Sequence, residues 1–155
     1  MVRLRAGVPD DGTALLALHH ASILSLGQGF YSAEELEDWA SGLTPGGYGR
    51  AMKEEDFLVA EAVTDQALAG FTSFKDDEVV GFYVHPDWAR CGLGSLLLER
   101  AEAAIAAGGH TTIRIEASLS GLPFYEARGY RNVRRRPYRT RGGLQVDIVE
   151  LTKAL

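Results

Sequence analysis

The sequence predicts an α/β fold in which a mixed, mostly antiparallel central sheet carries helices on both faces. Two observations predict it. The periodic segments follow the order strand, two helices, three strands, helix, strand, helix, two strands, which is typical of a three-layer arrangement. The apolar period changes from helical to two-residue at Asp56 and back to helical after the third strand of that group. With 155 residues, the chain fits one domain, residues 1–155.

The first 55 residues contain one short strand and two helices. Residues 2–6 form the strand, and Pro9 then opens a helix that runs to residue 26, before the glycines at 27 and 29. Ser32 and Glu35 form a capping box at the start of a short second helix. Residues 41–50, with one proline and four glycines, are expected to form a loop with a helical turn after it.

The middle of the chain predicts a hairpin, a central strand and a long helix. Residues 57–63 and 67–74 alternate around a three-residue turn and form the hairpin. Residues 78–84 are apolar on both faces, which favours a strand covered on both sides. Residues 92–107 form an amphipathic helix. Its predicted buried face consists of Leu93, Leu96, Leu97, Ala101, Ala104 and Ile105.

The last part of the chain predicts a strand, a short helix and a hairpin. Residues 111–117 form the strand, and the helix spans about residues 120–128 before Gly129. Strands at 130–138 and 144–151 finish the chain around two glycines.

Charge is unevenly distributed along the chain. The net charge is −5, but residues 1–127 carry −11 and residues 128–155 carry +6. Seven of the eight positive residues in the second part are arginines between Arg128 and Arg141. Such a stretch could mark a nucleic-acid or phosphate patch, whereas the overall acidity argues against nucleic acid as the main partner. No segment approaches the roughly 18 apolar residues of a membrane span, and the N-terminus lacks the apolar run of a signal peptide, so a cytoplasmic protein is expected.

The most specific chemical feature is the turn between the third strand and the long helix, residues 84–95. Unpaired N–H groups at a helix start, with glycines at 92 and 94 leaving the backbone open, outline a pyrophosphate site. The alternative is that these glycines only permit a tight joint. A Walker loop is excluded because no lysine follows, and a dinucleotide fingerprint is excluded because residue 97 is leucine.

This turn resembles the acyl-CoA turn of the GNAT N-acetyltransferase superfamily, which reads Gln/Arg-x-x-Gly-x-Gly/Ala after a Val-x-Pro strand end. Gly92 and Gly94 match the two glycines, and Val84-His85-Pro86 matches the strand end. Ala89 departs from the pattern, so a side-chain contact to the pyrophosphate is either lost or supplied by Arg90. The resemblance implies that acetyl-CoA binds mainly through the main chain of a set of residues at this turn: Arg90, Cys91, Gly92, Leu93, Gly94 and Ser95.

A second segment extends the resemblance. Residues 118–130 are similar to the family's Asn-x-x-Ala-x-x-Phe-Tyr-Glu-x-x-Gly-Phe/Tyr, with Ser118 and Gly121 at the two positions that differ. The resemblance implies that Ser118 contributes to CoA binding and that Tyr125 reaches the CoA sulfur. Because a thiol with a pKa of about 8.5 leaves more easily when a phenol donates a proton to it, Tyr125 is the predicted general acid. Core packing is the alternative role of Phe124 and Tyr125.

The catalytic base is less well determined. Glu78 stands eleven residues before Ala89, the separation found in histone-acetyltransferase-like members, although it also reads as part of a solvated acidic turn. Glu116 and a water chain without a dedicated carboxylate are the alternatives. The resemblance also implies a bulge that frees the backbone of Phe82, Tyr83 and Val84 to bind the pantetheine arm and polarise the thioester.

We therefore expect an N-acetyltransferase that moves an acetyl group from acetyl-CoA to a primary amine of a small molecule or peptide, by direct transfer in a ternary complex. Tyr31 and Trp39 fall where family members build the acceptor pocket, with core packing as the alternative. The competing hypothesis is a non-catalytic acyl-CoA-binding module. No metal site, nucleic-acid partner or membrane partner is expected. For the arginines from Arg131 to Arg141, three roles are considered: a solvated hairpin, the edge of a homodimer interface, or a group that recognises an acidic acceptor.

Overall fold

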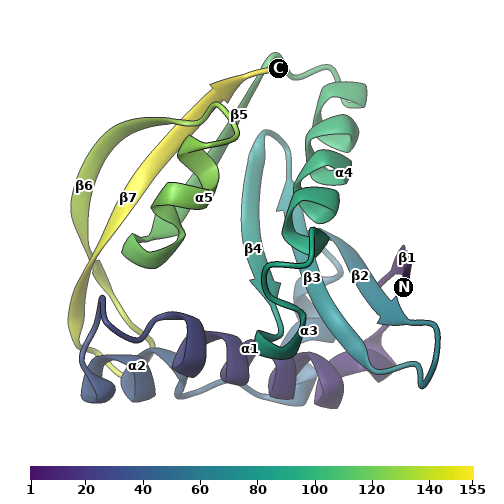
Figure 1. Ribbon diagram of the computed structural model, residues 1–155, viewed down its shortest axis with the longest axis horizontal. Coiled ribbons are helices and arrows are strands. Elements are labelled where there is room, and N and C mark those ends of the chain that lie inside the picture. The colour runs from purple at the N-terminus through teal and green to yellow at the C-terminus, as the bar shows by residue number, and fades with distance from the viewer.

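The computed structural model describes residues 1–155 and contains one seven-stranded sheet in the order β1-β2-β3-β4-β5-β7-β6 (Figure 1). The strands are β1 (Val2–Ala6), β2 (Asp56–Ala62), β3 (Leu68–Lys75), β4 (Glu78–Val84), β5 (Thr112–Ser118), β6 (Arg131–Arg139) and β7 (Gln145–Ala154). The helices are α1 (Gly12–Leu26), α2 (Ala33–Ala40), α3 (Pro45–Ala51), α4 (Leu93–Ala107) and α5 (Leu122–Glu126). Every neighbouring pair is antiparallel except β4 and β5, which are parallel. The predicted mixed, mostly antiparallel sheet is confirmed.

Helices cover both faces of the sheet, as predicted. In β2, Val59 packs with Leu15 of α1 and Tyr48 of α3, whereas the next residue, Ala60, packs with Leu97 of α4 on the opposite face. Helix α5 lies on the α4 side, over β5 and β7 (Figure 1). The side-chain alternation of a strand thus builds the three layers. None of the helices combines the length and the apolar composition that a bilayer crossing requires.

The sheet forks between β4 and β5. These strands pair only through Glu78 with Arg114 and Val79 with Ile115, and then diverge (Figure 1). The register of β3 against β4 shifts at the same level, because Ser73 pairs with Gly81 and Phe74 with Val79, so that Val80 is bulged. A bulge increases the local twist and bends the strand. The predicted bulge is therefore present, two residues before the segment where it was expected to act.

Three details differ from the sequence predictions. Residues 45–51 are helical, so the segment expected to be a loop is ordered from Pro45, which occupies the first turn without needing its missing N–H. The buried stripe of α4 includes Leu98 and leaves Ala104 exposed. Strand β4 packs on α1 through Tyr83 and on α4 through Phe82 and Val84, as predicted, but its cover is incomplete: Val80 is 51% exposed, because the strand leaves its neighbour there.

Candidate active site

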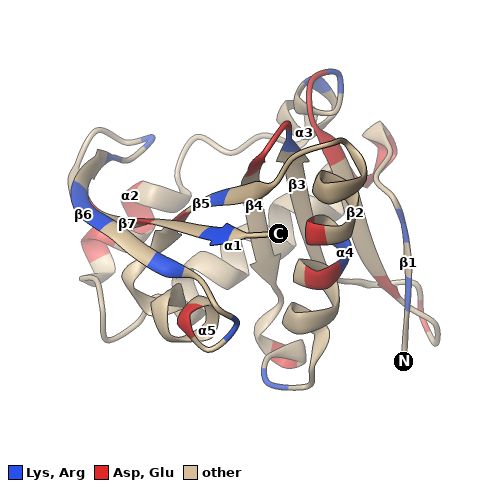
Figure 2. Ribbon diagram, turned by 90° about the horizontal axis from the view of Figure 1, so that it is seen from above, with Lys and Arg blue, Asp and Glu red and all other residues tan.

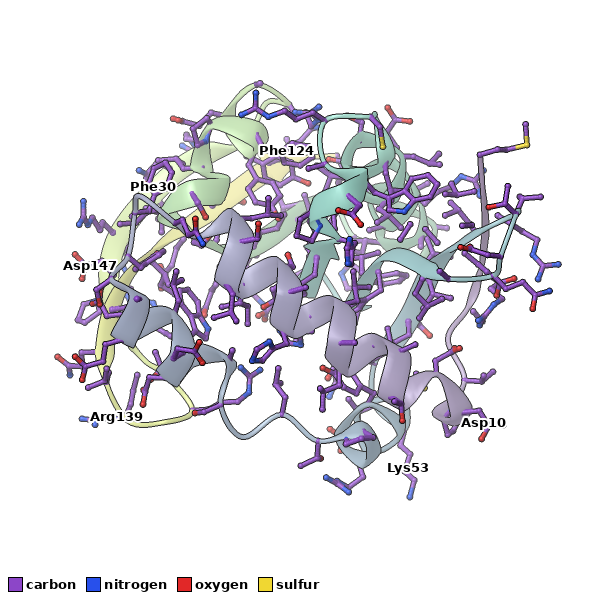
Figure 3. All side chains as sticks on the ribbon, turned by 60° about the horizontal axis from the view of Figure 1, so that its bottom comes forward. Asp10, Phe30, Lys53, Phe124, Arg139 and Asp147 are labelled. Atoms are coloured by element: carbon purple, nitrogen blue, oxygen red, sulfur yellow. The ribbon has the colours of Figure 1, made fainter.

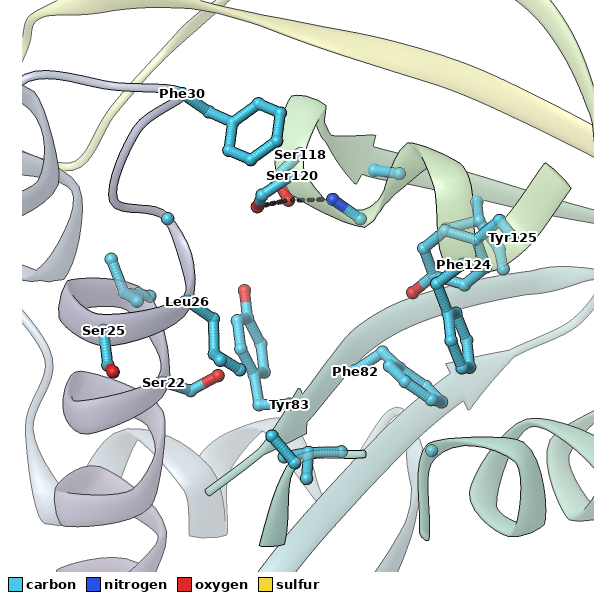
Figure 4. Close-up of a pocket in the computed structure, with 18 of the residues that line it drawn as sticks. Ser22, Ser25, Leu26, Phe30, Phe82, Tyr83, Ser118, Ser120, Phe124 and Tyr125 are labelled. Carbon is cyan, nitrogen blue, oxygen red and sulfur yellow. Dashed lines mark hydrogen bonds between the residues drawn. The ribbon is translucent and has the colours of Figure 1, made fainter. Parts of the chain in front are cut away.

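The fork between β4 and β5 opens into a cleft of about 860 Å³ (Figure 4). Its walls come from the C-terminal half of α1 and the loop after it, from β4 and the start of α4, and from β5 with α5. Tyr83 of β4 faces Ser118 at the end of β5 across the opening, and Phe82 of β4 packs on Tyr125 of α5 beside it (Figure 4). The cleft joins the two sequence segments that the motifs single out.

The turn before α4 offers a row of unpaired donors. The backbone N–H groups of residues 90–95 make no hydrogen bond within the protein, whereas the N–H of Leu96 donates to Gly92 O at 3.1 Å. Arg90 and Gly92 both have positive φ, 60° and 88°, which turns the chain sharply into the helix. A helix start with free N–H groups and a partial positive charge favours anions.

The two glycines of the turn serve different purposes. A Cβ at Gly92 would meet nothing within 4 Å, so glycine is favoured there by the positive φ. A Cβ at Gly94 would lie 3.1 Å from the Phe124 ring, so glycine is needed there for close packing of α4 on α5. Of the predicted turn residues, Arg90, Gly92, Gly94 and Ser95 line the cleft. Cys91 is exposed and its thiol donates to Trp88 O, while Leu93 is buried in the core.

The side chain of Tyr125 lies at the inner wall of the cleft. It is 6% exposed and packs edge-to-face on Phe82 and Tyr130. Its hydroxyl points toward the open space between α5 and β4 (Figure 4). Burial raises the pKa of Tyr125 above its usual value near 10, so the phenol stays protonated and can donate.

Ser118 closes the end of β5. Its hydroxyl accepts a hydrogen bond from Gly121 N at 3.2 Å and lies 2.9 Å from the Ser120 hydroxyl (Figure 4). It therefore caps the turn that leads into α5. The remaining predicted residues on β4, which are Phe82, Tyr83 and Val84, also line the cleft.

The two carboxylates considered as bases are placed differently. Glu78 lies at the paired start of β4, 3.3 Å from the Arg114 guanidinium, and does not line the cleft. Glu116 lies beyond the fork on β5, lines the cleft and forms an ion pair with Arg136 of β6. The structure brings Glu116, and not Glu78, to the cleft.

Two residues near the cleft have contacts that sequence analysis did not find. Arg128 donates through Nε to Ser95 Oγ at 3.0 Å, and its guanidinium lies 3.8 Å over the Phe124 ring, so it places a positive charge beside the start of α4. Its spacing of four residues from Phe124 on a predicted helix was the available signal. Tyr31 lines the cleft, as does Trp39, and the Tyr31 hydroxyl donates to Asp147 O and accepts from Leu119 N.

The C-terminal hairpin of β6 and β7 is rich in basic residues (Figure 2), and three of its six arginines form ion pairs with carboxylates. Arg134 and Arg136 both pair with Glu150, at 2.9 and 2.6 Å, and Arg135 pairs with Asp147 at 2.8 Å. This part of the arginine stretch forms a cross-strand ladder on the sheet.

Comparison with known proteins identifies related chains. Residues 29–148 match a family model described as an acetyltransferase (GNAT) domain. A GCN5-related N-acetyltransferase structure from Rhodopseudomonas palustris is 28% identical, with a TM-score of 0.93 over 100% of this chain and 96% of that one. PaiA N-acetyltransferase from Thermoplasma acidophilum, solved with coenzyme A, is 22% identical with a TM-score of 0.79 over 100% and 99%. The protein yncA from Salmonella typhimurium, solved with acetyl-CoA, is 17% identical with a TM-score of 0.67 over 100% and 94%. No curated protein sequence matches.

Proposed function

Because the chain belongs to the GNAT acetyltransferase family, we propose that it transfers an acetyl group from acetyl-CoA to a primary amine of a small molecule or peptide. The transfer is direct, within a ternary complex, and involves no covalent enzyme intermediate. Residues 1–155 act as a single domain, because one continuous seven-stranded sheet carries both walls of the cleft.

The observation that carries this proposal is the row of six unpaired N–H groups at residues 90–95, at the edge of a cleft opened by the fork of the sheet. A pyrophosphate accepts several hydrogen bonds and carries negative charge, which suits these donors. Arg90 and Arg128 add positive charge at the same edge. The pyrophosphate of CoA would bind here.

The part of β4 that diverges from β5 supports binding of the pantetheine arm of CoA. Beyond Val79 the strand has lost its β5 neighbour, so an extended pantetheine arm could lie along Phe82, Tyr83 and Val84 in place of a strand. The thioester would then reach the bulged region of β4, where backbone donors can polarise its carbonyl.

Tyr125 supplies the proton for the leaving group. The amine nitrogen attacks the carbonyl carbon, the C–S bond breaks, and the thiolate takes the phenolic proton, which solvent later restores. Burial keeps the phenol protonated, since it raises the pKa of Tyr125. Donation at this point stabilises charge that develops only in the transition state.

The attacking amine must lose a proton, and Glu116 is the proposed acceptor, either directly or through water. It is the carboxylate at the cleft, and its ion pair with Arg136 holds it in place. Glu78 stays a sequence prediction without a place in the cleft.

Release of the CoA thiol with a panel of primary amines tests the proposal. We expect turnover by the wild type and a fall in kcat of about a hundredfold in Tyr125→Phe, with little change in CoA affinity. Tyr130→Phe is the matched control, because Tyr130 is also buried but its hydroxyl donates to Glu102. CoA binding without turnover on any amine would instead identify an acyl-CoA-binding module.

A further inference from the structure

A second cavity, of about 300 Å³, lies on the sheet face that α1 and α3 cover. It shares three lining residues of β4 with the main cleft, namely Val80, Gly81 and Tyr83. The two cavities are therefore neighbours along the bulged segment where the thioester is proposed to lie. Its volume is at the lower end of the usual range for small-molecule sites, roughly 300–1,000 Å³.

Two arginines without carboxylate partners line this cavity. Arg141, from the turn between β6 and β7, donates to Trp39 O at 3.0 Å. Arg50, from α3, makes only a 3.4 Å contact with Thr44 Oγ1. Neither forms an ion pair, in contrast to Arg134, Arg135 and Arg136 of the neighbouring ladder. Both guanidinium groups keep donors available.

A buried histidine adds an unused polar atom. His19 of α1 is 5% exposed, its Nδ1 lies 2.9 Å from the Tyr48 hydroxyl, and its ring centroid is 3.9 Å from that of Tyr83. Its Nε2 is the one buried side-chain nitrogen or oxygen that lacks a hydrogen-bond partner. Such an atom costs free energy until something bonds to it. In the tautomer in which Tyr48 donates to Nδ1, Nε2 carries hydrogen and is a donor.

The charge of the cavity is positive. Burial lowers the pKa of His19 to about 3, so the ring is neutral. The charged lining residues are then Arg50, Arg141 and Glu55, which together carry one net positive charge. Because the net charge is positive, an anionic group is favoured over a cationic one.

The position of Arg141 is fixed by contacts with α2. Asp38 accepts hydrogen bonds from the Thr140 hydroxyl and from Leu144 N, and Gly142 N donates to Asp38 O at 3.3 Å. A Cβ at Gly142 would lie 1.9 Å from Asp38 Oδ1, so the turn can dock this closely only with glycine there. The docked turn holds Arg141 over the cavity.

We propose that this cavity is the anion subsite of the acceptor, and that the substrate is a small primary amine carrying a carboxylate that Arg141 and Arg50 bind. The inference rests on the proposed function. The planar guanidinium fork matches a carboxylate in two parallel hydrogen bonds. The amine of such a molecule would extend past Tyr83 toward the thioester. Diamines, which would place a second cation against the arginines, are poor substrates.

Matched amines test this proposal. The kcat/KM values of 4-aminobutyrate, n-butylamine and 1,4-diaminobutane are compared, followed by the same trio with six carbons. We expect the wild type to favour the amino acid at least tenfold at one of these lengths. Arg141→Gln and Arg50→Gln each reduce that preference about tenfold to a hundredfold, through KM of the amino acid, and leave n-butylamine unchanged. Arg141→Lys restores part of the preference.

Arg139→Gln is the matched control. Arg139 lies on the outer side of the same hairpin, donates only to Gly143 O and does not line the cavity (Figure 3). Its variant should keep the wild-type preference. Equal use of all three amines, or an equal loss for all three in Arg141→Gln, would overturn the proposal, since the arginine would then only hold the turn.

A binding measurement separates this proposal from the proposed function. If no amine is acetylated, 4-aminobutyrate and n-butylamine, with their six-carbon homologues, are titrated calorimetrically into protein saturated with CoA. Binding that favours an amino acid and is lost in Arg141→Gln would support the anion subsite although the transfer had failed. Absence of any such preference would overturn it.

Discussion

The two cavities beside β4 differ in the groups that would bind an anion: the first uses main-chain N–H groups, and the second uses arginine side chains. The main cleft owes its proposed anion-binding edge to the main-chain N–H groups that residues 90–95 leave unpaired at the start of α4. The second cavity owes its charge to side chains, Arg50 and Arg141, that come from α3 and from the β6–β7 turn. A main-chain site needs a backbone shape, whereas a side-chain site needs particular residues held by distant contacts.

This difference matters for tolerance to change. The turn at residues 90–95 keeps its N–H donors through substitutions that preserve the backbone conformation, because every residue other than proline carries an N–H group. The second cavity changes its charge when one side chain is replaced. Relatives with the same main cleft can therefore differ in the acceptor that they bind.

The largest expected effect breaks the main-chain site alone. In Gly92→Val, a β-branched residue must adopt φ near 88°, at a cost of about 1–3 kcal/mol, and the turn shifts to relieve the strain. We expect CoA affinity to fall about tenfold to a hundredfold, measured by calorimetry.

Gly109→Val is the control for that variant. Gly109 follows the other end of α4, has φ of 93° and equally open surroundings, and lies outside the cleft. It should lose similar stability but no CoA affinity. Equal losses of affinity in both variants would show that the N–H row does not bind the pyrophosphate.

The next effect concerns His19 and the second cavity. Its pKa in the folded protein, about 3, lies below the unfolded value of about 6.5, so below pH 6.5 the unfolded chain binds a proton that the folded chain does not. This stability contribution is complete above pH 6.5 and is lost as the pH falls toward 3. We expect His19 alone to contribute a slope of up to about 1.4 kcal/mol per pH unit to the free energy of unfolding between roughly pH 6 and 4.

Urea unfolding of the wild type and His19→Phe at several pH values measures this slope. The variant should lack the His19 contribution, while the removed partner of Tyr48 lowers its stability equally at all pH values in this window. Parallel curves for the two proteins would mean that His19 has the same pKa in the folded and the unfolded chain, so that the ring would add positive charge to the cavity below about pH 6.5.

The smallest expected effect concerns the side chain of Arg128, which we expect to contribute to CoA affinity at the main-chain site. Arg128→Gln removes a positive charge beside Ser95 and should weaken CoA binding a few-fold, about 1 kcal/mol, with the loss shrinking as salt rises. Arg131→Gln removes the same charge from an exposed position on β6 outside the cleft and should leave CoA affinity unchanged. Equal CoA affinity of the two variants would show that Arg128 does not contribute to CoA binding, and that the N–H groups of residues 90–95 bind the pyrophosphate without it.

Much of the fold could be predicted from the sequence because its signals are local. The bounds of β1 and β4 agree with prediction, and the predicted capping box of Ser32 and Glu35 forms both its hydrogen bonds. Each depends on alternation or on contacts within a few residues. The cover of β4 was predicted only in part, because an apolar strand can face either a helix layer or a cleft, and only its separation from β5 decides where the cleft opens.

The candidate site divides in the same way. The turn at residues 84–95 was predicted because a strand, two glycines and a helix start lie in one segment, and their backbone donors follow from that order. Glu78 and Glu116 could not be ranked, since the ranking depends on where two parallel strands part. Arg128 was counted only as one charge among seven, because its contact with Ser95 joins residues 33 positions apart.

Local signals in the sequence were enough to predict the seven strands in order, four of the five helices, the family, and a helix start with unpaired N–H groups, because hydrogen bonding and steric preference over a few residues dictate them. Three-dimensional contacts alone place Glu116, and not Glu78, in the lining of the cleft and leave some arginines without a carboxylate partner. Arg141 meets the backbone of Trp39 across 102 positions, and Glu116 meets Arg136 through pairing of three strands. Contacts at that separation follow from packing of the whole chain, and they set the charge of the cavity that we propose for the acceptor.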